Sequence, residues 1–202
     1  LKMFLSLIAL TAQLVFAAVL PEDRADVLYH SYDGGGVEVN GPSILVRKKF
    51  LDDFSVSANY YVDMVSSASI DVITTASAYS EERTQYSVGL DYLTNSTTIS
   101  MNFTNSSETD YQSDTASFTI SQDFFSNLTT LSLGYSNGSD IVKKNGQLDF
   151  LEAIDRQNYR LDLNQIISKN FIINLVVEGI TDQGFLNNPY RSVRFLDPTV
   201  EL

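Results

Sequence analysis

The sequence predicts an all-β fold, an antiparallel up-and-down transmembrane β-barrel of which this chain supplies about nine strands. Apolar and polar residues alternate with a period of two in successive stretches, the clearest about ten residues long, whereas a globular strand usually has about five or six. Short turns and longer polar segments separate these stretches. A hydrophobic fraction of 44% does not argue against a membrane protein, because only alternate residues of a barrel strand face lipid.

The clearest alternation lies in residues 54–66. One parity is apolar and consists of Phe54, Val56, Ala58, Tyr60, Val62 and Met64. The other parity consists of Ser55, Ser57, Asn59, Tyr61 and Asp63. A tilted strand of this length can cross a bilayer. We therefore expect the apolar parity to face lipid and the polar parity to line the interior of a barrel.

Two earlier strands are predicted before this one. Residues 26–32 form a weak strand that ends in a glycine-rich turn at residues 33–36, where glycine permits positive φ. Residues 37–50 follow, and their alternation changes phase at Gly41 and Pro42. The change of phase predicts a bulge or a bend.

Six later strands continue the pattern. Residues 51–53 turn the chain into the 54–66 strand, and residues 67–80 have no clean period and are predicted as a loop. The later strands each alternate on their own and cover residues 81–93, 97–104, 111–122, 128–136, 153–168 and 171–181. The segments between and after them are predicted as turns or loops at residues 94–96, 105–110, 123–127, 137–147, 168–170 and 184–190.

The strand count predicts that the chain is part of a larger barrel. Bacterial barrels have an even number of strands, and nine is odd, so we expect a comparable number of strands on the C-terminal side. Residues 191–195 are predicted to begin one of them. Because short turns are periplasmic in such barrels, the first strand should run outward from the periplasm.

The N-terminus predicts export. Residues 1–17 contain one basic residue, Lys2, an apolar run, and small residues near Ala17, which together predict a secretory signal peptide. Residues 18–202 are then the N-terminal part of an outer-membrane barrel domain. The alternative interpretation of residues 1–17 is a core helix.

Composition excludes several function classes. The chain has no Cys, which excludes a disulfide scaffold, thiolate metal sites and Cys nucleophiles. His30 is its only imidazole, which excludes a His-based metal cluster and a multi-haem protein. The net charge of −12 argues against a nucleic-acid partner. We expect no enzyme activity, no cofactor, no metal and no catalytic residues in this part of the protein.

Polar residues on the inward parity are the candidate functional residues. We predict that the lumen is lined by Asn59, Asp63, Asp91, Asn102, Arg156, Arg160, Asp162 and Glu178. Such residues select solutes by charge and size; alternatively, inward charges on adjacent strands pair with one another. Carboxylates near the loops offer weak evidence for Ca²⁺, with solvated loop charge favoured; they are Glu81, Glu82, Asp110, Asp114 and Asp140.

Aromatic residues gather on the apolar parity. They are Tyr60, Tyr86, Tyr92, Phe103, Phe118, Tyr135, Tyr159 and Phe171. They fit the aromatic girdles of a membrane barrel, and they equally fit the core of a water-soluble β-sandwich.

Several motifs resemble a known bacterial family. They are Tyr-Val-Asp at 61–63 leading into residues 66–69, Ser-Glu-Glu-Arg at 80–83, and Gly-Phe-Leu-Asn-Asn-Pro-Tyr-Arg at 184–191. With their surroundings they resemble the family catalogued as domain of unknown function 3570, over nearly all of the mature chain. The resemblance implies a Gram-negative outer-membrane β-barrel longer than this chain, with no established catalytic residues. It also implies a link to envelope redox traffic, because some members are thought to be encoded near flavin-transferase and thioredoxin-like proteins.

Two functional hypotheses follow from the sequence. The first is a passive, porin-like pore or a barrel scaffold in the outer membrane. Its expected partners are outer-membrane lipid, the barrel assembly machinery, and a lipoprotein or an envelope redox partner, with no nucleic acid. The second is a structural or binding module, either a secreted β-sandwich adhesin or a barrel sheath for an envelope redox partner.

Overall fold

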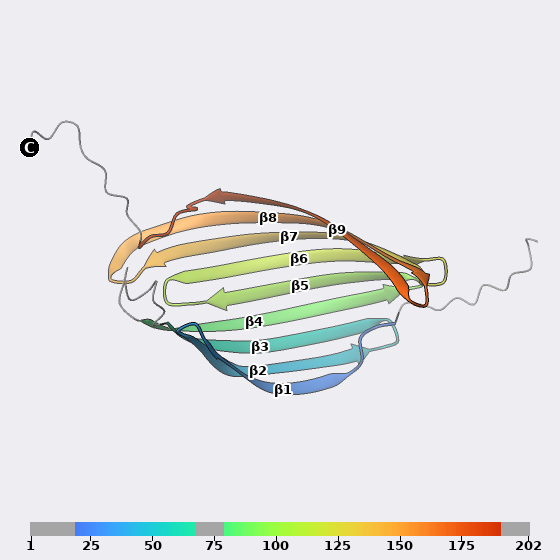
Figure 1. Cartoon of the computed structure of the whole chain (residues 1–202), viewed down its shortest axis with the longest axis horizontal. Coiled ribbons are helices and arrows are strands. Elements are labelled where there is room, and N and C mark those ends of the chain that lie inside the picture. The colour runs from blue at the N-terminus through green and yellow to red at the C-terminus, as the bar shows by residue number, and fades with distance from the viewer. Residues whose placement is uncertain (1–18, 68–78, 191–202) are drawn as a thin grey trace, which may run out of the picture.

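A computed structural model describes residues 19–67 and 79–190 of the chain, which form one antiparallel sheet (Figure 1). Its nine strands are β1 (Arg24–Gly34), β2 (Val37–Phe50), β3 (Phe54–Ser67), β4 (Tyr79–Thr94), β5 (Thr97–Ser107), β6 (Tyr111–Phe124), β7 (Thr129–Lys144), β8 (Gln147–Ser168) and β9 (Phe171–Gly184). The described residues contain no helix long and apolar enough to cross a membrane. The prediction of an all-β, up-and-down antiparallel fold is confirmed.

The strands lie side by side in the order of the sequence, from β1 to β9. At one end, which we call the turn end, short connections join β2 to β3, β4 to β5, β6 to β7 and β8 to β9. At the opposite end, the loop end, the remaining connections lie, including residues 108–110 between β5 and β6. β1 and β9 each pair with one neighbour only among the described strands, so the sheet is not closed.

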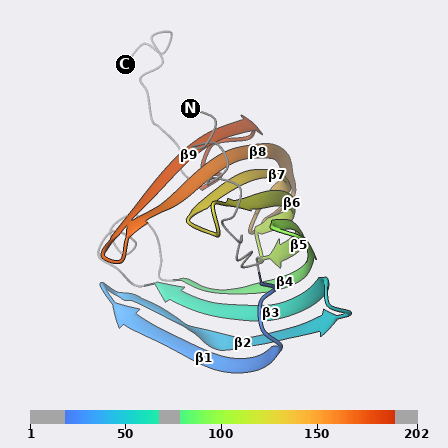
Figure 2. The same ribbon diagram turned by 90° about the vertical axis from the view of Figure 1, so that its right-hand side faces the viewer.

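The sheet is strongly curved. Figure 2 shows it rising from β1 through β5 to β9 around an open concave side. Side chains from strands that are not adjacent meet on one face only: His30 of β1 reaches Asp63 of β3, and Arg156 of β8 reaches Tyr111 of β6. Side chains two strands apart approach one another on the inside of a curve. The face that carries these residues is therefore the concave one.

Register assigns every strand residue to a face, because directly paired residues in an antiparallel sheet point to the same side. Tyr60 pairs with Ile44 and Tyr86, and this set extends across the sheet on the convex face. The convex face carries the apolar parity of every strand from β3 to β9, and its large side chains are half exposed; Leu133 is 53% exposed. The concave face carries Ser, Thr, Asn, Gly and charged residues.

The described residues contain almost no conventional core. Four hydrophobic residues are buried, namely Leu20, Val62, Val142 and Ile154. A water-soluble sandwich buries the apolar face of each sheet against a second sheet. No second sheet covers the convex face within residues 19–67 and 79–190.

The strand count of nine is confirmed, but two predictions about local structure are wrong. Residues 137–147 were predicted as a loop, whereas β7 continues to Lys144 and a two-residue turn at Asn145 and Gly146 leads into β8. Gly146 has φ 80°, which suits the tight Asn-Gly turn of a hairpin. The predicted β8 therefore begins too late, at residue 153 instead of 147.

Of the bulge or bend predicted at Gly41 and Pro42, the bulge is wrong, although the pairing of β2 with β3 is interrupted at these two residues. The pairs Asn40–Met64 and Ser43–Tyr61 keep one register across this point, so neither strand has an inserted residue. A Cβ at Gly41 would lie 1.8 Å from the carbonyl oxygen of Val62. Glycine is needed here because the β3 backbone lies against it. Register shifts occur instead between Lys143 and Lys144 and between Ile166 and Ser168.

Three predicted features fall on residues that the structure does not describe. They are the signal peptide at residues 1–17, the middle of the 67–80 loop, and the further strand at residues 191–195.

Candidate functional site

The candidate functional site is the concave face. Register places all eight residues predicted to line a lumen on this face. One paired row contains Asp91, Ser100, Thr119, Gly134, Arg160 and Glu178, and a neighbouring row contains Asn102 and Asn158. That these side chains line a lumen stays a prediction.

Charged candidate residues on β8 and β9 have hydrogen-bond partners. Arg160 donates two hydrogen bonds to the carboxylate of Asp162, at 2.8 and 3.1 Å. Glu178 accepts a hydrogen bond of 2.6 Å from the side chain of Asn158. Arg160 and Asp162 lie on the same strand, and the partner of Glu178 is a neutral amide, so these contacts are not the pairing of charges between adjacent strands that was the alternative prediction.

Arg156 belongs to a cluster around the buried carboxylate of Asp140, near the loop end. Its Nε donates to Asp140 Oδ2 at 2.8 Å, and its Nη2 donates to the Tyr111 hydroxyl at 2.5 Å. The Tyr111 hydroxyl in turn donates to Asp140, which is only 1% exposed. Burial, and then the hydrogen bond to Asp140, raise the pKa of Tyr111. The cluster links β6, β7 and β8 and fills part of the concave face.

His30 and Asp63 form a second cluster across β2. His30 Nε2 lies 2.8 Å from Asp63 Oδ1 and 3.3 Å from the Tyr61 hydroxyl, and the two rings stack with centroids 4.9 Å apart. The residue of β2 that pairs with His30 is Gly41. Because Gly41 has no side chain, the imidazole of β1 can reach the carboxylate of β3.

Three carboxylates meet at the loop end. One oxygen each of Glu81, Glu108 and Asp110 lies within 4.8 Å of the others. Burial raises the pKa of Glu81, and the neighbouring Asp110 and Glu108 raise it further. Burial also raises the pKa of Glu108, an effect that Arg83 opposes from 3.8 Å. Mutual repulsion and partial desolvation thus favour protonation of this group.

This grouping differs from the predicted carboxylate set. Asp140 lies in the cluster with Arg156. Asp114 accepts a hydrogen bond from Asn105, and register places both on the convex face. Glu82 pairs with Met64 and also belongs to the convex face. Glu108, which the sequence did not single out, joins Glu81 and Asp110 because the loop between β5 and β6 has only three residues.

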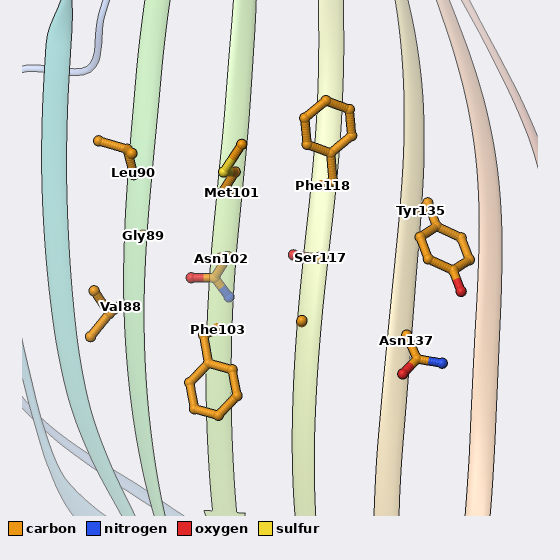
Figure 3. A pocket seen from close by; sticks show the side chains of 11 residues that line it. Val88, Gly89, Leu90, Met101, Asn102, Phe103, Ser117, Phe118, Tyr135 and Asn137 are labelled. Atoms are coloured by element: carbon orange, nitrogen blue, oxygen red, sulfur yellow. The ribbon is translucent and has the colours of Figure 1, made fainter.

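A shallow hollow of about 460 Å³ lies on the convex face over β4 to β7 (Figure 3). Leu90, Met101, Phe103, Phe118 and Tyr135 form much of its wall. The wall consists almost wholly of apolar atoms, so the hollow suits hydrocarbon rather than a polar substrate.

One of three comparisons with known proteins gives a match, to part of the chain. A comparison with curated proteins and one with solved structures each give no match. Residues 71–162, which include β4 to β7 and most of β8, match the model of a family described as Protein of unknown function (DUF3570). Of the motifs that carry the resemblance, Ser-Glu-Glu-Arg at 80–83 lies within the matched range. The match therefore supports the family that the motifs resemble, over residues 71–162.

Proposed function

We propose that this sheet is part of the wall of a β-barrel in the Gram-negative outer membrane, and that its concave face lines a passage for small polar solutes. The observation that carries the proposal is a band of apolar residues on the convex face, which we call the apolar strip. It runs from Phe54–Met64 on β3 to Ile173–Val177 on β9. The strip does not follow the paired rows of the sheet; it slants across them at the angle that a membrane barrel requires.

The slant can be worked out from the register. On β5 the strip is centred on Met101, whose paired row runs through Phe118, Tyr135 and Tyr159 to Gly179 on β9. On the convex face of β9, the apolar residues that keep the regular register with β8 are instead Ile173, Leu175 and Val177, so the strip is centred four residues from Gly179; Phe171 lies beyond the register shift.

A shift of four residues over four strands is one residue per strand. With a rise of about 3.3 Å per residue and a strand spacing of about 4.8 Å, the strands tilt by about 35° to the normal of the strip. Strands in closed barrels tilt by about 35–45°. When the strands tilt as they do in a barrel, the apolar strip therefore lies parallel to the membrane plane. A band of residues that contacts lipid must have this orientation.

On β3, the height of the apolar strip agrees with the height of the apolar band of an outer-membrane barrel. Its apolar parity runs from Phe54 to Met64, a length of about 33 Å along the strand and about 25 Å along the normal at a tilt near 40°. The apolar band of outer-membrane barrels is about 25 Å tall. On β5 the strip narrows to Ile99, Met101 and Phe103, about 13 Å along the strand, so the full height of the apolar band is carried by β3 and not by every strand.

Aromatic pairs lie within the strip. Phe54 and Tyr92 stack with ring centroids 4.7 Å apart, and Tyr60 and Tyr86 lie 5.1 Å apart on the same two strands. The Phe54–Tyr92 pair lies at one edge of the strip, where amphipathic rings are favoured at a membrane interface, whereas Tyr60 lies near the middle of the strip on β3.

A scaffold is the second candidate function. The cluster of Tyr111 and Arg156 around the buried Asp140 favours it, because these side chains occupy part of the concave face near the loop end. In that case the barrel is plugged, and it supports a lipoprotein or an envelope redox partner rather than passing solutes. A barrel of this kind has no catalytic role.

Conductance of the full-length protein in planar bilayers tests the proposal. Discrete current steps are expected, and Glu178→Lys should shift ion selectivity toward anions because Glu178 lies on the concave face. Thr181→Lys, on the convex parity of the same strand, is the matched control and should leave selectivity unchanged. Silence from a folded barrel would favour the scaffold. Recovery of the protein in the soluble fraction, with no heat-shifted band on unboiled gels, would refute the membrane assignment.

A further inference from the structure

The segment after β9 is anchored at both of its ends. At the first end, Gly184 has φ 120°, and a Cβ there would lie 2.1 Å from the carbonyl oxygen of Ala153. Only glycine fits this position, where the chain leaves β9. The N–H of Phe185 then donates to the same Ala153 oxygen at 3.0 Å, and the Phe185 ring meets Phe150 edge-on at 5.4 Å.

At the second end, the segment is held by Tyr190. The Tyr190 hydroxyl donates to Asp110 Oδ2 at 2.6 Å and accepts from the backbone N–H of Asn145 at 2.8 Å. The N–H of Tyr190 donates to Asn188 Oδ1 at 2.9 Å, which closes a turn. Residues 185–190, which we call the strap, thus run from β9 to the β7–β8 turn and on to the loop between β5 and β6. Figure 1 shows the chain turning back after β9 toward the β7–β8 turn.

Two buried hydrophobic residues lie between these anchor points. Val142 of β7 and Ile154 of β8 are 6% and 5% exposed. Register places both on the concave face: Ile154 pairs with Gly184, and Val142 pairs with Tyr111, the residue next to Asp110. Other apolar side chains on this face, Val176 and Ile180 of β9, are 43% and 61% exposed, so Val142 and Ile154 need a cover to be this buried.

We propose that the strap folds across the loop-end opening on the concave side, covers Val142 and Ile154, and narrows the passage there. The hydrogen bond between Tyr190 and Asp110 is its latch, and Gly184 is the bend that directs it inward. The strap therefore sets the size of solute that passes the loop end. This last step rests on the proposed function, whereas the cover over Val142 does not.

The latch has a strength that can be measured. Both hydrogen bonds of the Tyr190 hydroxyl are exposed to solvent, so each should change the ratio of closed to open strap by about fivefold, and the two together by at least about tenfold. Tyr190→Phe keeps the ring and removes the hydroxyl that contacts both Asp110 and Asn145. It should open the strap by at least about tenfold without disturbing the strands.

Single-cysteine labelling of the full-length protein tests the cover, because the chain supplies no thiol of its own. Val142→Cys should react slowly with a water-soluble maleimide, and at least about tenfold faster when combined with Tyr190→Phe. Ile154→Cys is a second reporter in case the first impairs folding. Ser136→Cys, on the concave face of the same strand, is the control and should react quickly in both backgrounds.

The outcomes of these experiments distinguish the proposal about the strap from the proposal about the pore. If Val142→Cys and Ile154→Cys both label as fast as Ser136→Cys before the latch is removed, the strap does not cover this face and the inference is wrong. If Tyr190→Phe leaves slow labelling unchanged, Tyr190 is not the latch. In planar bilayers Tyr190→Phe should enlarge the current step. Latch-dependent labelling without any current would uphold the strap and refute the pore.

Discussion

An arginine placed on the convex face should prevent stable insertion, whereas the same residue one position earlier should not. Leu133 is the middle of the three apolar residues on β7, and it pairs with Ile120 and Leu161. Its position at the centre of the strip places it near the bilayer midplane. Ser132 lies beside it on the concave face and pairs with Ser121 and Asp162. The two substitutions differ only in the face to which the charge is added.

The expected magnitudes follow from the two environments. A lipid-facing Arg near the midplane costs about 2–4 kcal/mol, which lowers the ratio of folded to unfolded protein by about 30-fold to 900-fold. Ser132→Arg loses the 2.8 Å hydrogen bond between Ser121 and Ser132, a cost of about 1 kcal/mol. Part of this cost is offset because the new guanidinium faces the Asp162 carboxylate.

Refolding of the full-length protein into lipid vesicles measures the difference. The folded fraction can be read from the heat-shifted band on unboiled gels across a urea titration, and the midpoints give the change in free energy. Leu133→Arg should move the midpoint far more than Ser132→Arg. Equal midpoints, or a larger loss for Ser132→Arg, would show that the convex face is not the lipid face and would refute the argument from the slanted strip.

Two further predictions concern particular contacts. Gly41→Ala should destabilise the fold by about 3 kcal/mol, because its Cβ would lie 1.8 Å from the Val62 carbonyl oxygen; Gly134→Ala, whose Cβ meets nothing closer than 3.5 Å, should be near neutral in the same urea titration. The raised pKa values of Glu81 and Glu108 favour the folded state at low pH, so this contribution is present below pH 4.5 and lost as pH rises through the raised values. Glu108→Gln should therefore flatten the decline of the urea midpoint above pH 4.5, and an unchanged pH profile would contradict the clustering.

Period-two alternation was enough to predict nine strands, because a strand with one lipid-facing side must place its apolar residues at every second position. Alternation failed where both faces are polar. Residues 137–140 continue β7 beyond the apolar strip, and Asn137, Gly138, Ser139 and Asp140 place no apolar side chain on either face. Their Asn, Gly and Asp content is typical of a turn, and only pairing with β8 makes them a strand.

The sequence predicted which residues share the concave face, but it did not predict which of their side chains contact one another. A pattern identifies which face Arg156 occupies, whereas its partners Asp140 and Tyr111 come from strands up to 45 residues away. The strap was missed for the same reason. Residues 184–190 were predicted as a loop, and nothing local in that sequence shows that Tyr190 reaches Asp110, 80 residues earlier.

The sequential strand order has a consequence for how the sheet forms. Every strand pairs with its neighbour in the chain, so each hairpin closes a small loop, and sheets built from such local contacts form faster than sheets with distant pairings. The exceptions are the outer edges of β1 and β9, whose peptide groups have no partner among the described strands. Unpaired edges of this length are templates for aggregation in water. Growth of the sheet should therefore be rapid, and joining its two edges to further strands should be the slow, vulnerable step of assembly.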